Sequence, residues 1–385
     1  MKFSSLPKKK IDSQTYNRYV SPLKSILEYT PELKSRGDRP LKLKFEDQLN
    51  ALIYFHLQEL DSCRHLLQDL EENEFARRCI APEGGISLSS FSEAINNRGL
   101  EQLQFVFKEL NKKACKILPK EFQELGDLIA IDGSLIDATL SMYWADYKTN
   151  SKKAKGHFGF NINQGIPSKV YLTDGNGAER PFVNTILSPG QTGVMDRGYQ
   201  CHNAFDLLQQ EGKSFVCRIV SNTTITTLKK RPLPEGENFI FDDAHVLLGT
   251  PKVNQTKTPV RLVSYKVEGT KYYVATDRFD LTARQVAEVY RLRWNIESFF
   301  KWWKSHLKVY HLIARSEYGL MAQMLGGLIS YLLMAIYCHE MFNEKVSIKR
   351  IRELRSTIFN ELLGAGASTD NENVLKEHEK PHAKT

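Results

Sequence analysis

The sequence predicts an α/β protein in which a mixed sheet with flanking helices follows a helical N-terminal region. Three observations support this class. Residues 1–115 repeat apolar side chains at spacings of three and four, as amphipathic helices do. From Leu128 onward, short apolar runs alternate with turns rich in Gly and Asn, as strands do. A long amphipathic helix then begins at Thr282, where Thr282 and Gln285 have the spacing of a capping box.

The N-terminal region contains two predicted helices, at residues 45–60 and 63–80. The run Ala-Pro-Glu-Gly-Gly at residues 81–85 then breaks the pattern. Ser90-Phe91-Ser92-Glu93 resembles a capping box and predicts a short helix over residues 91–97. A helix, a Gly turn and a polar helix are typical of a helix-turn-helix, and equally of an ordinary helical bundle. The pattern alone leaves both interpretations open.

The following region, which we place at residues 120–340, carries the strand signals. Apolar runs occur at residues 128–131, 155–162, 170–173, 192–195 and 214–219, with a helix-like segment at 204–210. Three successive strands followed by alternating helix and strand favour a mixed sheet of the ribonuclease-H kind.

Two further segments differ in composition from the rest of the chain. Residues 220–280 are rich in Thr, Val, Pro and Gly, and they alternate in polarity at 260–267 and 272–275, which predicts a mostly β insertion. Residues 341–385 are expected to form a C-terminal helix and a tail. The tail after Gly364 is small, polar and charged, and is predicted to be disordered.

The composition is that of an ordinary globular protein, with 41% hydrophobic and 25% charged residues. Fifty-three Lys and Arg against 45 Asp and Glu give a net charge of +8, which suits a polyanionic partner without requiring one. The six cysteines are scattered singly, so neither a zinc site nor a disulfide framework is indicated.

No apolar stretch follows Lys8-Lys9-Lys10, so we expect no secretory signal peptide. The most apolar run, residues 324–338, is shorter than the roughly 20 residues of a membrane span and predicts a buried core helix. We therefore expect a soluble, cytoplasmic protein with no membrane partner.

Two aspartates follow apolar strands directly. Asp132 ends the run Ile129-Ala130-Ile131, and Asp196 ends Gly193-Val194-Met195. An aspartate at the end of a buried strand loses hydration and needs hydrogen bonds or a cation to compensate. Either residue alone is also consistent with a loop-capping Asp, which is common.

The helix after Thr282 carries a more specific pattern. Tyr290, Arg293, Glu297 and Lys304 are spaced so that they share one stripe along about four turns. The alternative is a solvated face of i,i+4 ion pairs, each worth only about 0.3–0.5 kcal/mol. A core-facing stripe lies on another side of the helix and consists of Leu292, Ile296, Phe299 and Trp303.

Tyr-x2-Arg-x3-Glu-x6-Lys, present here as YRLRWNIESFFKWWK, resembles the signature of bacterial insertion-sequence transposases of the DDE class. These belong to the large family named after the fourth insertion sequence described. IAIDGSLID resembles the first-Asp motif of that family and GVMDRGY the second. The resemblance covers about residues 120–340, and the interval before Glu297 leaves room for the β insertion that family members carry.

The resemblance implies a ribonuclease-H-like fold in which Asp132, Asp196 and Glu297 are catalytic and hold two Mg2+ ions, with Mn2+ as a substitute. Two metals roughly 3.5–4 Å apart can clamp the attacking and leaving oxygens of phosphoryl transfer. Arg293, Lys304 and Tyr290 would bind phosphate near the cleaved DNA end. The implied enzyme cleaves double-stranded DNA at the terminal inverted repeats of an element and joins the ends to target DNA, as a homodimer on DNA.

Two details concern base recognition. Asn96, Asn97 and Arg98 are candidate base-reading residues, because Asn and Arg pair with adenine and guanine edges in the major groove. Some family members hold a flipped base against a tryptophan in the β insertion, but no Trp occurs between Arg197 and Tyr290. The aromatic candidates there, which are equally packing residues, are Phe239, Phe241, Tyr272 and Tyr273.

Two other functions remain open from the sequence. A structure-specific DNA nuclease that performs no strand transfer would have the same carboxylates. A non-catalytic DNA-binding regulator would use the basic N-terminal region alone, and it would have no need of three acidic motifs.

Overall fold

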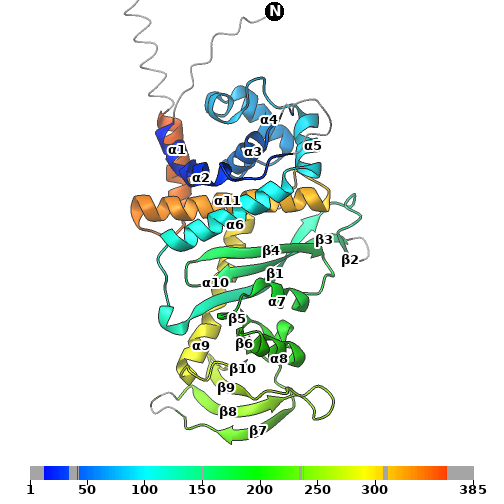
Figure 1. Cartoon of the computed structure of the whole chain (residues 1–385), viewed down its shortest axis with the longest axis vertical. Helices are drawn as coiled ribbons and strands as arrows, with labels where there is room; N and C mark the ends of the chain where they lie inside the picture. The colour runs from blue at the N-terminus through cyan, green and yellow to red at the C-terminus, as the bar shows by residue number, and fades with distance from the viewer. Residues whose placement is uncertain are drawn as a thin grey trace, which may run out of the picture. The chain divides into compact units, whose positions relative to one another are not determined.

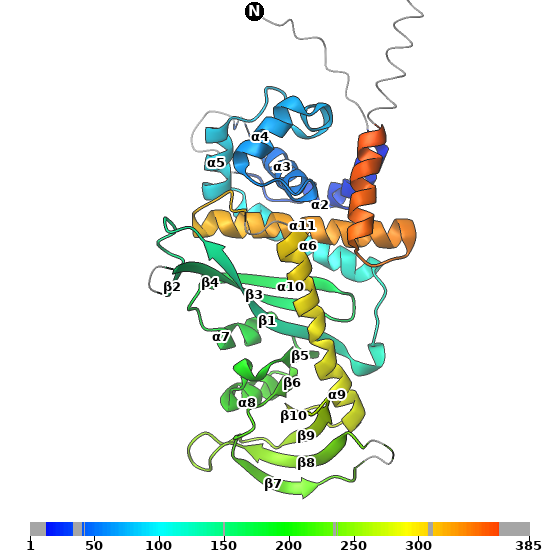
Figure 2. The ribbon, with the colours of Figure 1, turned by 180° about the vertical axis from the view of Figure 1, so that it is seen from behind.

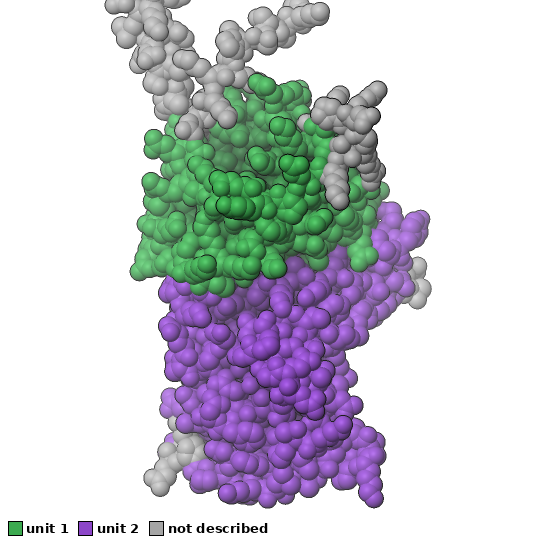
Figure 3. Space-filling model, in the orientation of Figure 1, with its two compact units in different colours: residues 1–117, 305–385 green, residues 118–304 purple. Residues whose placement is uncertain are grey.

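The computed structural model describes residues 13–33, 41, 43–148, 151–233, 236, 238–306 and 311–361. They fall in two compact units, each described by itself. Unit 1 comprises residues 1–117 and 305–385, and unit 2 comprises residues 118–304 (Figure 3). The tail that was predicted to be disordered after Gly364 lies outside the described residues.

Unit 1 is helical, and its core is a single long helix, α11. Because Gly326 of α11 has no side chain, α3 can approach closely, and a Cβ there would lie 3.0 Å from the Cβ of Leu52. α11 packs against α3, α5 and α6 (Figure 1). Residues 348–361 form a further helix. The other elements are α1 (Gln14–Val20), η1 (Ser21–Leu23), α2 (Lys24–Leu27), α3 (Phe45–Leu57), α4 (Cys63–Glu72), η2 (Ala76–Ile80), α5 (Leu88–Asn97), α6 (Leu100–Ile117) and α11 (Glu317–Phe342).

α11 lies within the region that we predicted at residues 120–340, and that domain boundary stays a prediction. The compact unit that holds the sheet ends at Lys304, and α11 belongs to unit 1. The physical reason is that α11 is apolar on all sides and needs neighbours on all sides. Among the described residues α11 alone is long and apolar enough to span a membrane, but 94% of its most apolar window is buried. The buried core helix predicted at residues 324–338 is therefore confirmed.

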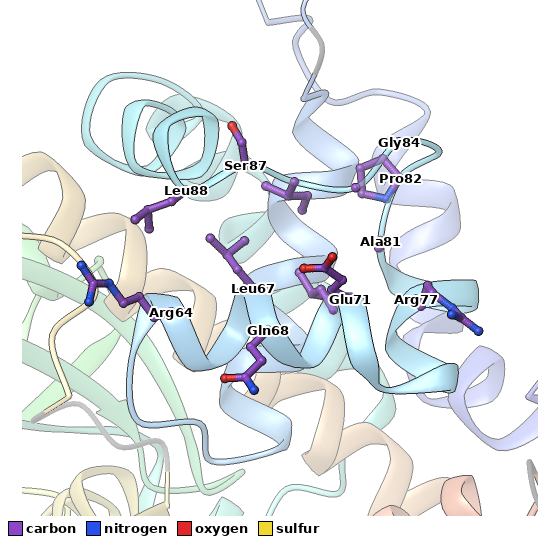
Figure 4. Close-up of a pocket in the computed structure, with 13 residues that line it drawn as sticks. Arg64, Leu67, Gln68, Glu71, Arg77, Ala81, Pro82, Gly84, Ser87 and Leu88 are labelled. Carbon is purple, nitrogen blue, oxygen red and sulfur yellow. The ribbon is translucent and has the colours of Figure 1, made fainter. Parts of the chain in front are cut away.

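The segment that the sequence left open as a helix-turn-helix or an ordinary helical bundle contains an irregular turn. α4 ends at Glu72 because Asn73 is extended, and the Asn73 side chain accepts from the Ala76 amide to start the π-helical turn η2. α5 begins at Leu88, three residues earlier than predicted, because Ser87 and not Ser90 caps it. A hollow of about 700 Å³ lies between α4 and residues 81–88, as Figure 4 shows.

Unit 2 contains a mixed ten-stranded sheet. Its order is β2-β3-β1-β5-β6-β10-β9-β8-β7, with β4 on β3 (Figure 1). β1 is antiparallel to β3 and parallel to β5, and β5 is parallel to β6. The predicted α/β class, with a large mixed sheet and flanking helices, is confirmed. The strands are β1 (Asp127–Ala138), β2 (Asp146–Lys148), β3 (Ser151–Asn161), β4 (Ile166–Asp174), β5 (Gln191–Met195), β6 (Ser214–Arg218), β7 (Ile225–Lys230), β8 (Ile240–Leu248), β9 (Val260–Val267) and β10 (Thr270–Thr276).

Helices cover both faces of the sheet. α7 (Arg180–Ile186) and α8 (His202–Gln210) lie on one face, and their apolar side chains form a core cluster with Ile129 and Ile131 of β1. α9 (Ala283–Leu292) and α10 (Trp294–His306) lie on the other face (Figure 2). There Phe158 of β3 packs edge-on against Trp303, at 5.0 Å between ring centroids. The four residues predicted as the core-facing stripe are all buried.

The segment predicted as a β insertion is not a separate layer. β10 pairs antiparallel with β6, so β7 to β10 extend the central sheet. After β10 the chain enters α9 through residues 277–282, and two arginines fasten this turn. Arg261, 1% exposed, forms a bidentate pair with Asp243 and also donates to the Leu281 carbonyl. Arg278 donates to the Leu125 carbonyl and to Thr192 Oγ1, both at 2.9 Å.

Candidate active site

Strand register brings the two candidate aspartates to one edge of the sheet. Ala130 of β1 pairs with Val194 of the parallel strand β5, so Asp132 and Asp196 stand at the same level two residues further on. Side chains alternate across a strand, and Ile129 and Ile131 face α7 and α8. Asp132 consequently faces α9 and α10.

The helix that carries the remaining candidates is divided into two segments. Thr282 and Gln285 form the predicted capping box at its start, which is confirmed. The predicted continuous helix is interrupted at Arg293, between α9 and α10. The physical reason is a local tightening of the turn: the Arg293 amide donates to the Tyr290 carbonyl, and the Ile296 amide donates to the Arg293 carbonyl, both three residues back.

This interruption lies where the acidic residues meet. Arg293 Nη2 is 2.6 Å from Glu297 Oε1, and Arg293 Nη1 is 3.6 Å from Asp132 Oδ2. The Tyr290 hydroxyl donates to Asp196 Oδ1 at 3.0 Å. Three elements distant in sequence thus converge, and the stripe predicted on the helix faces both aspartates.

The electrostatics of the site are dominated by burial and by clustered negative charge. Burial raises the pKa of Asp132 to about 6. The Gly133 amide, which donates to Asp132 Oδ1 at 2.8 Å, and the Arg293 guanidinium oppose this shift, while Glu179 and Glu297 add to it. Partial burial lowers the pKa of Lys304, and the negative charges of Asp137 and Asp132 oppose this shift.

Sequence reasoning missed two charged residues here. Arg218 ends β6, where Met195 pairs with Cys217, and its Nη1 lies 4.0 Å from Asp196 Oδ1. Its place directly after an apolar strand was a usable signal, the same one that identified the aspartates. The Glu179 carboxylate lies over Gly133, where a Cβ would be 2.9 Å from Glu179 Oε1. No pattern in the sequence around Glu179 indicated this position.

The donor set suits a hard divalent cation, because carboxylate oxygens are the ligands that Mg2+ prefers. The raised pKa of Asp132 reflects burial beside other carboxylates, and a cation would relieve that repulsion. Asp132, Asp196 and Glu297 are the residues that would hold it. The described part of the chain contains no group of three metal-ligating side chains already close enough to share an ion.

An aromatic cavity of about 430 Å³ lies beside Tyr290. Of the four base-stacking candidates, Phe239 and Tyr272 line this cavity. The other two do not: Phe241 is 42% exposed, and Tyr273 packs against the core cluster. The further aromatic residues of the cavity wall are Tyr265, Tyr290 and Trp294.

The base-reading candidates lie at the end of α5 in unit 1. The Asn96 side chain is occupied at both ends: Nδ2 donates to the Ser92 carbonyl and Oδ1 accepts from Ser316 Oγ at 2.6 Å. Asn97 is exposed, and its amide donates to the Glu93 carbonyl. Arg98 is half-buried at the C-cap. A DNA-reading role for Asn96, Asn97 and Arg98 stays a prediction.

Comparison with known proteins identifies the family. The transposase DDE domain matches residues 124–333, which is more than half of the chain and includes all three candidate carboxylates. The chain belongs to the transposase DDE domain family. The resemblance to bacterial insertion-sequence transposases of the DDE class is thereby confirmed.

Two curated relatives agree with this family. A protein of Sinorhizobium fredii, itself assigned as a transposase, is 28% identical over 199 residues, which is 50% of this chain and 56% of the relative. A protein of a Synechocystis species, assigned as a transposase for the insertion sequence element IS4SA, is 25% identical over 257 residues, 65% of this chain and 72% of the relative. The chain thus spans little more than half the length of the first of these relatives.

One solved structure also resembles the chain, a piggyBac transposase in a synaptic complex with hairpin DNA. It shows 14% identity and a TM-score of 0.44, with 97% of this chain and 81% of that one covered. A likeness at this level has no bearing on the function of this DDE-family chain.

Proposed function

We propose that the chain is a DNA transposase that cleaves the ends of an insertion sequence and joins them to target DNA by divalent-metal-dependent phosphoryl transfer. The observation that carries this proposal is the convergence of Asp132, Asp196 and Glu297 around Arg293 and Tyr290. A ribonuclease-H-like arrangement of β1, β5 and α10, with the acidic residues at one sheet edge, is part of the proposal.

The three carboxylates would hold two Mg2+ ions, with Mn2+ as a substitute. Bound there, the ions would activate a water or the 3′-OH of the DNA as nucleophile and would stabilise the charge on the leaving oxygen. Each carboxylate comes from a different rigid element, so their mutual geometry is fixed by strand register and by the packing of α10 against β3. Such fixed positioning accounts for much of the rate in phosphoryl transfer.

The cations beside the carboxylates would orient DNA. Arg293 offers a planar fork for a phosphate. Lys304 offers a point charge further along the same helical segment. Arg218 is close enough to Asp196 to contact a phosphate next to the scissile one. The cavity lined by Tyr272 and Phe239 would accept an unpaired base at the DNA end, since every base can stack on an aromatic ring.

The expected partners are the terminal inverted repeats and target DNA, and a second copy of the chain, because both ends of an element must be cut together. Cytoplasmic, nucleoid-associated localisation belongs to the same proposal. The net charge of +8 supports a DNA partner through counterion release from neutralised phosphates.

An oligonucleotide assay tests this proposal against its alternatives. Duplexes carrying the inverted repeats that flank the gene are incubated with the full chain, Mg2+ and a supercoiled plasmid. Cleavage at the repeat end followed by joining to the plasmid is the expected result. Cleavage with no joined product would instead indicate a structure-specific nuclease. Binding of the repeats with neither product would indicate a non-catalytic regulator.

A further inference from the structure

Each of the three carboxylates already has a donor within the DNA-free chain. Glu297 and Asp132 share the Arg293 guanidinium, at 2.6 and 3.6 Å, and Asp196 accepts from the Tyr290 hydroxyl at 3.0 Å. These two donors are residues to which the proposed function gives DNA phosphate contacts. One pair of side chains is therefore directed at two different anions, carboxylate and phosphate.

The contacts of Arg293 conflict with metal binding. A Mg2+ ion lies about 2.0–2.1 Å from its oxygen ligands. An ion held by Glu297 and Asp132 would consequently lie within a few ångström of a guanidinium that contacts the same two groups. Two like charges at such a distance in a partly buried site repel strongly. This agrees with the lack of a ready three-ligand group in the described part of the chain.

The same guanidinium has an unmet need that a phosphate would fill. The Arg293 side chain is only 9% exposed, and its Nε is buried without an acceptor among the described residues. A buried donor without a partner costs free energy. A phosphate oxygen is a strong acceptor for arginine and binds through charge-assisted hydrogen bonds. The guanidinium is thus better satisfied by phosphate together with a carboxylate than by the carboxylates alone.

We propose that Arg293 is a metal latch: it keeps divalent ions from Glu297 and Asp132 until a DNA phosphate takes its guanidinium. The latch rests on the proposed function, because it takes the carboxylates to be metal ligands. Metal loading then follows DNA binding, so that the ions are assembled only where a strand is present to be cut. Thermodynamic linkage requires the reverse effect as well: bound metal raises the affinity for DNA by the same factor by which DNA raises the affinity for metal.

The test measures Mn2+ binding by the full chain, from the loss of the free-ion electron paramagnetic resonance signal. Without DNA, Arg293→Gln should bind Mn2+ about tenfold or more tightly than the wild type. Arg291→Gln is the matched control, because it removes the same charge only two residues along the chain. The Arg291 side chain is 70% exposed, so this variant should bind Mn2+ like the wild type. Arg293→Lys retains the charge and should stay within about threefold of the wild type.

A second measurement begins with the wild type, so its first result does not depend on how well a variant folds. Wild-type Mn2+ affinity should rise about tenfold or more when a duplex carrying the flanking inverted repeat is added, and Arg293→Gln should show less than a threefold rise. Equal affinity in the wild type and Arg293→Gln, with both weakened by Asp196→Asn, would overturn the latch and leave the metal site standing. Tight binding in Arg293→Gln that survives Asp196→Asn would place the ion elsewhere, and would overturn both the latch and the metal site.

Discussion

Replacing Asp132 with Asn should stabilise the metal-free protein, and more so as the pH rises. Burial and neighbouring carboxylates raise the pKa of Asp132 from 3.8 to about 6 in the folded chain. A carboxyl whose folded pKa is raised binds its proton more tightly when folded, so its ionisation costs stability as the pH rises from about 4 to 6. A shift of about two units corresponds to roughly 3 kcal/mol above pH 6. An amide of the same shape does not carry this cost.

The assay is thermal melting in EDTA at pH 5 and pH 7.5. About half of the cost is already present at pH 5, so the advantage of Asp132→Asn should grow by roughly 1–2 kcal/mol between the two pH values. In a domain of 150–250 residues this corresponds to roughly 2–8 °C in Tm. Mg2+-dependent strand cleavage should fall by about a thousandfold or more, because a metal ligand is lost.

The opposite result would refute the reasoning. A structural Asp132, held in a buried ion pair with Arg293, would lose about 3–5 kcal/mol when one partner is removed. An Asp132→Asn protein that melts well below the wild type at both pH values, and still cleaves at the wild-type rate, would show a structural residue. Asp146→Asn is the control, because the Asp146 carboxylate is likewise ion-paired, with Lys152 of β3, but is 71% exposed.

Four further outcomes are expected. Asp196→Asn and Glu297→Gln should each reduce cleavage about a thousandfold while leaving DNA affinity in a gel shift in EDTA unchanged, because metal-free binding depends on the basic surface. Lys304→Ala should lower the log–log salt slope of duplex binding by about 0.9, the value for one lost phosphate contact. Tyr272→Ala should weaken the quenching of 2-aminopurine placed at the DNA end, since stacking is worth about 1–3 kcal/mol per base. Asn97→Ala should cost about 1–3 kcal/mol of discrimination between repeat ends and random duplex.

Each of these outcomes has a control and a contrary result. Retained cleavage in either carboxylate variant would remove that residue from the triad. An unchanged salt slope would make Lys304 a solvated surface lysine. Phe241→Ala lies outside the aromatic cavity, so a loss of quenching equal to that of Tyr272→Ala would count against a specific stacking site. Unchanged discrimination between the two duplexes in Asn97→Ala would remove Asn97 from end recognition.

The sequence predicted unit 2 well because its signals are local. Val260–Val267 is a strand with the predicted bounds, and Thr282 caps the helix as expected. The family signature of Tyr290, Arg293 and Glu297 identified side chains that do meet the aspartates. Strand register could not be derived, because pairing between distant segments leaves no trace in the periodicity of either one. Glu179 shows this limit, since only folding brings it over Gly133.

Other expectations failed for identifiable physical reasons. The helix was expected to run unbroken past Arg293, but it is interrupted there by hydrogen bonds to carbonyls three residues back. The spacing of apolar residues does not show which carbonyl each amide bonds, so the sequence could not predict this tighter turn. The cap of α5 was misplaced because Ser87 and Ser90 are both good caps, and only the structure shows which side chain accepts a backbone amide. An all-apolar helix such as α11 does not reveal which neighbours bury it, so the domain boundary at residue 340 stays a prediction.

The pairing of β10 with β6 has a consequence for how such a chain can be altered. Because β10 leads directly into the turn fastened by Arg261 and Arg278, the placement of α9 depends on β8 and β9. Deleting residues 220–280 would therefore also remove the strands and side chains that hold α9 in place. The edge strand β7 is exposed along its whole length. Substitutions there should disturb the position of Glu297 least. Sequence exchanges in this segment should therefore be made at β7 and should leave the Asp243–Arg261 pair intact.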